Sequence, residues 1–272
     1  YLERQVGFGY RIPGTPAHAA TAAWLDSLLR TRADSVVVQA WDHVTGKGDT
    51  LPMRNLLARY NLAARERILF LAHWDTRPRA DQDTGSRASQ PIPGANDGAS
   101  GVAVLLAMAD ALRATSPEIG VDLLFLDGED YGFFPDTDVL LGSTYYAAHQ
   151  VGPKPEYGVL LDMVGGKGST FPKEGYSVTA APTVVELVWK TAARRGHGSY
   201  FLNQNGGSIT DDHIPLQKAG IKMIDVIAEF GQGYSFPYWH TLDDSIDKLS
   251  AETLGAVGDV MMTLVREAKR PD

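Results

Sequence analysis

The stretch Ile68-Leu69-Phe70-Leu71-Ala72-His73-Trp74-Asp75 decides the fold. It begins with a continuous apolar run, and a run this short is typical of a strand buried on both faces in a parallel sheet. His73 and Asp75 follow directly at the end of that run. Open α/β sheets bind ligands at the carboxyl ends of their strands, so these polar residues mark a candidate site.

A turn, a helix and a second strand follow the first. Gly94-Ala95-Asn96-Asp97-Gly98 predicts a turn, and the apolar residues of 98–112 predict a largely buried helix. Residues 121–126 predict a buried strand that ends in Asp127-Gly128-Glu129-Asp130. A further apolar strand, predicted at 159–164, carries Asp162. Three predicted strands therefore bring acidic or imidazole side chains toward one edge of a sheet.

The rest of the chain alternates in the same way. Further strands are predicted at 36–38 and 55–60, as antiparallel edge strands, and at 221–227. Helices are predicted after the Thr15-Pro16 cap and at 140–149, 182–195 and 250–269. The polar stretch 76–93 predicts a long functional loop. We expect one α/β domain over residues 1–272, with three layers: a central, mixed, mostly parallel twisted sheet flanked by helices.

The composition excludes several classes of protein. The 272 residues are 44% apolar and 21% charged, as in an ordinary globular protein. The net charge of −8 speaks against binding of nucleic acid, which needs clustered positive charge. Cysteine is absent, so the chain forms no disulfide and must bind any metal through His, Asp or Glu. No apolar run is long enough to span a membrane. Because the chain starts at Tyr1, we expect that a signal or anchor segment has been removed.

Residues at the strand ends are the first candidates for chemistry. His73 and Asp75 point to the same side of an extended strand, so one can bind a metal while the other orients it, or both can satisfy turn amides. Asp97 can bind a metal or cap the following helix. Glu129 and Asp130 are adjacent like charges. Either a metal binds one while the other moves protons, or both lie in a solvated loop.

Asp162 and two later histidines complete the set. Asp162 lies in an apolar strand, where a carboxylate must be paired, protonated or metal-bound. Asp211-Asp212-His213 and Trp239-His240 each offer a histidine that is either a ligand or a loop residue bonded to backbone. The remaining histidines have surface-like settings and receive no role: His18, His43, His149 and His197. Nitrogen and oxygen donors favour zinc, and the lack of a Gly-x-Ser-x-Gly motif disfavours a serine hydrolase.

Several motifs together resemble the glutaminyl-peptide cyclotransferases, or glutaminyl cyclases, within the zinc aminopeptidase-like family. The likeness is to bacterial relatives of the animal-type enzymes and covers nearly the whole chain. The motifs are Gln5-Val6-Gly7-Phe8-Gly9, Arg11-Ile12-Pro13-Gly14-Thr15-Pro16, His73-Trp74-Asp75-Thr76-Arg77-Pro78, Gly94-Ala95-Asn96-Asp97-Gly98-Ala99-Ser100-Gly101, Glu129-Asp130-Tyr131-Gly132, Leu161-Asp162, Asp211-Asp212-His213-Ile214-Pro215 and Trp239-His240-Thr241.

The resemblance implies a zinc enzyme that converts the N-terminal glutamine of peptides or proteins to pyroglutamate and releases ammonia. It implies a location outside the cytoplasm, as a periplasmic, secreted or lipid-anchored protein. The implied residues are Asp97, Asp130 and His240 for one zinc ion, Glu129 as general acid and base with Asp162 and Asp211 in its carboxylate network, and Trp239, Phe134 and His213 for the substrate.

The aminopeptidase branch of the same family is the alternative. There His73 and Asp162 would hold a second zinc ion, and the enzyme would hydrolyse N-terminal residues from peptides. Two features favour the cyclase: the Trp239-His240 pair, and Asp211, which stands where aminopeptidases commonly carry serine. One feature departs from the animal cyclases, which carry a tryptophan shortly after a Glu-Glu pair. This chain has Tyr131-Gly132-Phe133-Phe134-Pro135, so we expect an altered pocket wall.

Overall fold

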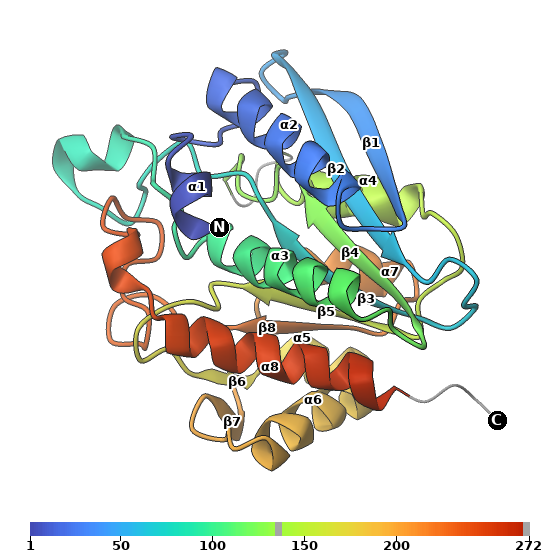
Figure 1. The fold of residues 1–272 in the computed structure, drawn as a ribbon. Coiled ribbons are helices and arrows are strands. Elements are labelled where there is room, and N and C mark those ends of the chain that lie inside the picture. Colours follow the sequence, from blue (N-terminus) through green and yellow to red (C-terminus); the bar gives the residue numbers. More distant parts are fainter. Residues whose placement is uncertain (134–137, 269–272) are drawn as a thin grey trace.

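The computed structural model describes residues 1–133 and 138–268 (Figure 1). Its centre is a six-stranded sheet in the order β1-β2-β4-β3-β5-β8. The strands are β1 (Ser35–Val44), β2 (Thr50–Tyr60), β3 (Arg67–His73), β4 (Gly120–Leu126), β5 (Tyr157–Asp162) and β8 (Met223–Ile227). β4, β3, β5 and β8 are parallel, whereas β2 pairs antiparallel with both β1 and β4. The predicted mixed, mostly parallel sheet is confirmed.

Helices cover both faces of the sheet and complete the three predicted layers (Figure 1). α2 (Pro16–Arg30), α3 (Ala99–Ala114), α6 (Pro182–Arg194) and α8 (Ala251–Glu267) pack on one face, and α4 (Leu141–Ala148) and α7 (His213–Lys218) on the other. Within β3, Phe70 faces the first layer and Leu69 and Leu71 face the second. This alternation explains why the strand reads as continuously apolar. Each such side chain contributes about 1.5–3 kcal/mol by leaving water.

Several short elements escaped the sequence pattern. They are α1 (Leu2–Val6), β6 (Phe171–Lys173), α5 (Gly175–Ala180), β7 (Phe201–Asn205) and α7. Such elements carry too few residues to show a hydrophobic period. The predicted edge position of residues 55–60 is wrong, because β2 has a partner on each side and β1 forms the edge. The predicted Thr15-Pro16 cap is confirmed, since the Thr15 side chain accepts the N–H of His18.

Close packing of α3 brings two candidate carboxylates together. Gly101 lies where a Cβ atom would collide with the carbonyl oxygen of Leu161, so only glycine permits this approach. The first turn of α3 therefore lies against the end of β5. Asp97 precedes that turn, and Asp162 ends β5. Within the described residues, no helix has the length and apolar character needed to cross a membrane.

Candidate active site

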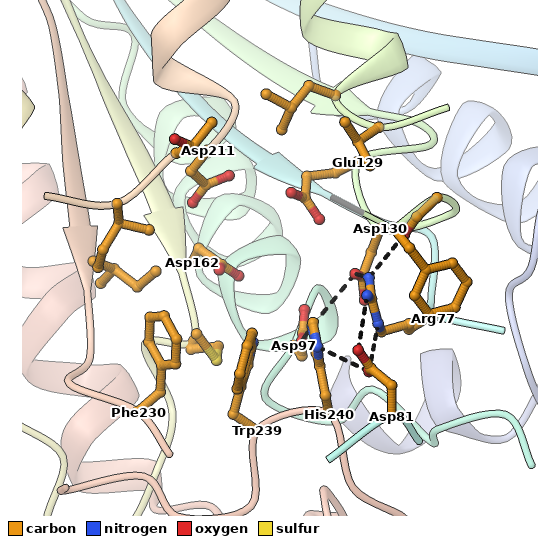
Figure 2. Close-up of a pocket in the computed structure, with 18 residues that line it drawn as sticks. Arg77, Asp81, Asp97, Glu129, Asp130, Asp162, Asp211, Phe230, Trp239 and His240 are labelled. Carbon is orange, nitrogen blue, oxygen red and sulfur yellow. Dashed lines mark hydrogen bonds and ion pairs between the residues drawn. The ribbon is translucent and has the colours of Figure 1, made fainter. Parts of the chain in front are cut away.

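A small cavity of about 260 Å³ opens at the carboxyl ends of the parallel strands (Figure 2). It is lined by acidic, aromatic and aliphatic side chains, including Asp97, Glu129, Asp130, Asp162, Asp211, Ile227, Phe230, Trp239 and His240. Drug-sized ligands occupy cavities of about 300–1,000 Å³. A cavity of this size suits a single amino-acid residue rather than an extended peptide.

Asp97, Asp130 and His240 form a metal-competent group on the cavity wall. Their donor atoms all lie within 4.8 Å of one another. Nε2 of His240 is 3.5 Å from Oδ2 of Asp97 and 3.4 Å from Oδ1 of Asp130, too far for good hydrogen bonds. Two donors on one tetrahedral zinc ion lie about 3.3 Å apart. Oδ2 of Asp130 is also buried without a hydrogen-bond partner. The residues therefore fit a bound zinc ion.

His240 is held on several sides. Its Nδ1 lies 3.2 Å from Oδ1 of Asp81, and Trp239 stacks on its ring at a centroid distance of 3.9 Å. A carboxylate behind a histidine ligand fixes the ring and its tautomer. Burial disfavours the charged imidazole, but Asp130 and Asp81 outweigh it and raise the pKa of His240 to about 9. The carboxylates around His240 therefore favour a positive charge at this position, whether from a protonated imidazole or from a bound metal ion.

Arg77 is a site residue that sequence reasoning missed. Its Nη1 donates to Oδ1 of Asp130 at 2.5 Å and to the carbonyl oxygen of Gly132 at 3.1 Å. Its Nε donates to Oδ1 of Asp81 at 2.8 Å. Arg77 thus connects one carboxylate of the metal-competent group to the carboxylate that orients His240. Its motif, Arg77-Pro78, was part of the family likeness and was the available signal.

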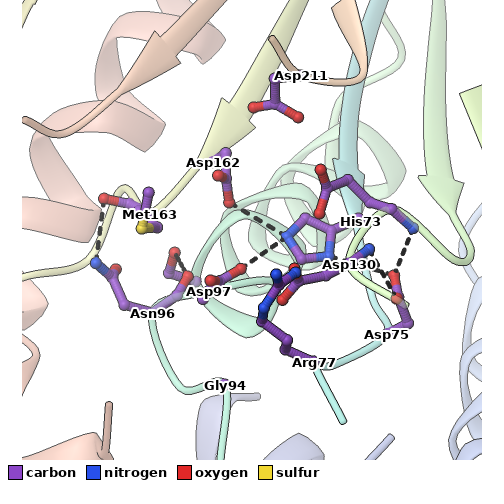
Figure 3. A network of polar contacts seen from close by, with 12 residues as sticks. His73, Asp75, Arg77, Gly94, Asn96, Asp97, Asp130, Asp162, Met163 and Asp211 are labelled. Carbon is purple, nitrogen blue, oxygen red and sulfur yellow. Dashed lines mark hydrogen bonds and ion pairs between the residues drawn. The ribbon is translucent and has the colours of Figure 1, made fainter. Parts of the chain in front are cut away.

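A second metal-competent group shares Asp97 (Figure 3). Nε2 of His73 lies 3.1 Å from Oδ1 of Asp97 and 3.3 Å from Oδ1 of Asp162. His73 is 1% exposed and, unlike His240, does not line the cavity. Asp75 faces the other ring nitrogen at 3.3 Å. Asp75 therefore lies where it can orient the ring of His73, and metal binding by His73 stays a prediction.

Asp75 also organises the second acidic motif. Its two carboxylate oxygens accept the backbone N–H groups of Glu129 and Asp130, each at 3.1 Å. The loop after β4 is thereby tied to the loop after β3. This link holds the candidate base Glu129 and the candidate ligand Asp130 at fixed positions beside the cavity.

The loop that carries Asp97 is fixed by buried charges. Gly98, with φ of +88°, precedes the helix, and no side chain caps its N-terminus. Asp97 is therefore not a helix cap, and its carboxylate is free to face the site. Asp244 accepts the backbone N–H of Asn96 at 2.8 Å and that of Asp97 at 3.0 Å. Arg11, which is fully buried, donates to the carbonyl oxygen of Gly94 at 2.7 Å.

Glu129, Asp162 and Asp211 turn toward a common space beside the metal-competent group (Figure 2). Burial, together with the charge of Asp130, raises the pKa of Glu129 well above its ordinary value. Burial also raises the pKa of Asp162 to about 7 and raises that of Asp211. Such carboxyl groups can hold or accept protons near neutral pH. The arrangement is suited to proton transfer next to a metal ion.

The aromatic wall differs in part from the predicted one. Trp239 lines the cavity as predicted and packs on Phe230 at a centroid distance of 4.6 Å. Phe133 also lines the cavity, with the guanidinium of Arg77 4.5 Å from its ring centroid. The predicted Phe134 lies outside the described residues. Phe230 carries no motif of its own, so no sequence signal singled it out.

Two histidine predictions are wrong. His213 was expected to contact the substrate, but it has no exposed surface and does not line the cavity, because the first turn of α7 points it inward. His18 was expected at the surface. It is 3% exposed, its Nε2 lies 2.8 Å from Oδ1 of Asp127, and its ring stacks on Trp74. An α-helical face packed on a sheet hides His18, which the local sequence does not show.

Backbone strain is concentrated at the cavity. Within the described residues, Leu140, Met163, His240 and Asn61 are the non-glycine residues with positive φ, and the first three line the cavity. Left-handed backbone costs about 1–3 kcal/mol per non-glycine residue and often marks functional sites. His240 therefore occupies its place at a local energetic cost, which the surrounding contacts offset.

The fold and this donor arrangement define a metal-dependent exopeptidase-like protein. Residues 55–265 match the family model of peptidase family M28, and the chain belongs to that family. The glutaminyl cyclase of Bacteroides thetaiotaomicron, solved bound to N-acetylhistamine, is 40% identical with a TM-score of 0.93, over 99% of this chain and 96% of its own. The predicted relationship to bacterial glutaminyl cyclases is confirmed.

Solved structures that carry other names are equally similar to this chain in sequence and in fold. A leucine aminopeptidase precursor from Bacteroides thetaiotaomicron is also 40% identical, with a TM-score of 0.93, over 99% of this chain and 95% of its own. The glutaminyl-peptide cyclotransferase of Bos taurus is 26% identical over 94% of this chain and 78% of its own length. Because these names include both a glutaminyl cyclase and an aminopeptidase, similarity alone does not separate the two activities, and the residues of the site must be considered.

Proposed function

We propose that this chain is a glutaminyl-peptide cyclotransferase, which closes the N-terminal glutamine of a peptide or protein to pyroglutamate. The observation that carries the proposal is that Glu129 and two further carboxylates face the same small cavity as the Asp97, Asp130 and His240 group (Figure 2). The 40% identity to a bacterial glutaminyl cyclase supports it.

One zinc ion is proposed for the cavity, with Asp97, Asp130 and His240 as its ligands. When bound, it would polarise the side-chain amide carbonyl of the substrate and stabilise the negative charge that develops on the oxygen. The cavity position of this group supports one ion here, because His73 of the second group lies behind the wall.

Glu129 is proposed as the group that moves the proton. It accepts a proton from the α-amine as the amine nitrogen forms a bond to the γ-carbonyl carbon of the same residue. It then returns the proton to the side-chain nitrogen as the carbon–nitrogen bond breaks, and ammonia leaves. Burial and neighbouring carboxylates raise the pKa of Glu129 well above its ordinary value, which favours proton uptake and release by this group.

Asp162 and Asp211 are proposed as partners of Glu129 in this proton transfer. Both line the cavity and are nearly buried, at 7% and 3% exposure. Three carboxyl groups so close together cannot all be ionised without a large penalty, so they share protons. Such sharing keeps Glu129 able to act in both directions.

Trp239 and Phe230 are proposed as the wall that holds the glutamine side chain. Their packed rings give the cavity a flat apolar side opposite the carboxylates. A bound residue placed between these walls would have its amine and its amide carbonyl close together, which favours ring closure. The small volume admits the terminal residue and excludes water as it binds.

A di-zinc aminopeptidase is the second candidate. The group formed by His73, Asp97 and Asp162 favours it, because its donor atoms are as close together as those of the first group. The similarity to a leucine aminopeptidase precursor also supports it. In that enzyme Glu129 would take a proton from the attacking water.

The test is to incubate the zinc-loaded protein with a peptide that begins with glutamine and to follow its mass. We expect loss of one ammonia without chain shortening, at a rate far above that of the peptide alone. A matched peptide that begins with asparagine controls for deamidation. Release of a free N-terminal amino acid, from this peptide or from one that begins with leucine, would refute the cyclase in favour of the aminopeptidase.

A location outside the cytoplasm remains a prediction from the family likeness. Fractionation of the source cells tests it, with an antibody against this chain. Recovery with cytoplasmic markers would contradict it.

A further inference from the structure

A third group of metal-competent side chains lies behind the cavity wall. Asp211 and His213 come from the start of α7 and the loop before it, and Asp225 comes from β8. Their donor atoms lie within 4.8 Å of one another. Asp211 is 3% exposed, and the other two have no exposed surface. His213 and Asp225 do not line the cavity, so the proposed reaction gives them no task.

Several polar atoms of these side chains lack hydrogen-bond partners. Nδ1 of His213, both carboxylate oxygens of Asp225 and Oδ2 of Asp211 are buried without one, whereas Nε2 of His213 faces Glu174 at 3.3 Å. Each such atom costs about 1–3 kcal/mol if it stays unsatisfied. Most buried polar groups in proteins have a partner. Several unpartnered donors and acceptors that face one another therefore indicate a ligand between them.

The geometry resembles that of the His240 group in having carboxylates near both ring nitrogens of a histidine. There, one ring nitrogen faces two carboxylates while Asp81 approaches the other nitrogen at 3.2 Å. In the third group, Nδ1 of His213 lies 3.9 Å from Oδ2 of Asp225, and Nε2 lies 3.3 Å from Oε2 of Glu174. A separation of 3.9 Å is too long for a hydrogen bond and about 0.6 Å longer than the spacing of two donors on a tetrahedral zinc ion, so binding of an ion would draw the two side chains slightly together. A carboxylate behind the histidine is the usual arrangement at metal sites.

The local charge is also unbalanced. In the part of the chain that the structure describes, no lysine or arginine forms an ion pair with Asp211, Asp212 or Asp225, and the one ion pair to them comes from His213. Isolated charges of one sign are costly in a buried position. A divalent cation would remove that cost.

We propose that Asp211, His213 and Asp225 bind a divalent metal ion, separate from the ion in the cavity, with Glu174 orienting His213. One imidazole and two carboxylates form a nitrogen and oxygen donor set that suits zinc. Asp211 also lines the cavity, so the ion would fix the carboxylate that stands beside Asp162 and Glu129. The site is enclosed, and its ion should exchange slowly.

The direct test is a crystal of the full chain grown with zinc chloride, with anomalous difference maps measured above and below the zinc absorption edge. We expect a peak between Asp211, His213 and Asp225 that is present only above the edge. Density for water alone, with no anomalous signal at this position, would overturn the proposal. This measurement uses only the wild-type protein, so the proposal can be tested even if variants fail to fold.

Variants give an independent test by metal analysis. Asp225→Asn should lose one equivalent of zinc per chain relative to the wild type, and adding His240→Ala should remove a further equivalent. The matched control is Asp127→Asn, since Asp127 is equally buried but is bonded directly to His18 at 2.8 Å. This control should keep the wild-type zinc content. A folded Asp225→Asn protein with unchanged zinc content would refute the site, whether or not the protein is a cyclase.

Discussion

Arg77 donates to Oδ1 of Asp130 at 2.5 Å, so a cation holds the carboxylate that we assign to the metal. The other oxygen of Asp130 is buried and has no hydrogen-bond partner. Arg77 also binds Asp81, which in turn faces His240. One guanidinium therefore positions two parts of the metal-competent group.

Replacement of Arg77 should weaken zinc binding. Arg77→Met keeps much of the volume but removes the charge that fixes Asp130 and Asp81, and we expect zinc affinity to fall by about 10–100-fold. Competition with a chromogenic chelator measures the change. Arg87→Met is the control, because Arg87 pairs with Asp83 and Asp243 at an exposed position. Equal affinities in both variants would contradict the role of Arg77.

Replacement of Glu129 should stop turnover while the metal remains bound. Glu129→Gln removes the proton acceptor but not a proposed ligand, so we expect kcat to fall by about 10²–10⁴-fold. Zinc content, measured on the same sample, should equal that of the wild type. Glu186→Gln, at an exposed position, serves as the control. Substantial residual activity in Glu129→Gln would assign the proton transfer to another group.

Replacement of Trp239 should affect substrate binding more than chemistry. Loss of the ring in Trp239→Ala removes about 1.5–3 kcal/mol of apolar contact, which corresponds to a rise in KM of about 10–150-fold. Trp239→Phe should recover most of this, because it keeps a ring against Phe230 and His240. If both variants lost zinc instead, Trp239 would act through its stacking on His240 rather than on the substrate.

Glu174 should make stability sensitive to acid. Burial alone would raise its pKa, but hydrogen bonds from His213 and Ser177 and from the backbone outweigh burial and lower the pKa to about 2. A lowered folded-state pKa gives stability that is present above the unfolded-state value, about 4.5, and is lost as pH falls toward 2. The Glu174→Gln variant lacks this contribution at every pH.

Urea unfolding of the metal-free proteins measures this effect. Between about pH 5.5 and about pH 2.5, the free energy of unfolding should fall in the wild type by on the order of 2 kcal/mol more than in Glu174→Gln. Parallel curves for the two proteins would show that Glu174 is not ionised in the folded chain. The metal-free proteins are used because zinc would dissociate in acid and would itself change the free energy of unfolding.

The buried parallel strands and the donor residues that follow them were predictable for a common physical reason. Short runs such as 68–72 and 121–126 are apolar throughout because both faces of β3 and β4 are buried. Parallel strands place their carboxyl ends at one edge, so residues that follow them converge. Asp97, Asp130 and Asp162 meet there, as expected from the sequence.

Other parts of the site depend on tertiary paths that no local pattern reveals. Arg77 and Asp81 lie in a polar loop, and their contacts with Asp130 and His240 require the loop to fold back over the sheet edge. His213 follows the cavity residue Asp211 by only two positions. It is nevertheless buried in the interior, at the first turn of α7. Its direction depends on how the helix is docked, which spacing along the chain does not fix.

The late position of His240 orders events during synthesis. Asp97 and Asp130 leave the ribosome well before the loop after β8, which carries His240. A nascent chain that ends at β5 presents carboxylates without the imidazole that completes the cavity group. If His240 is a ligand as we propose, the cavity site is complete only after the last strand has been made, and a chain that terminates before His240 would bind the ion more weakly than the full chain.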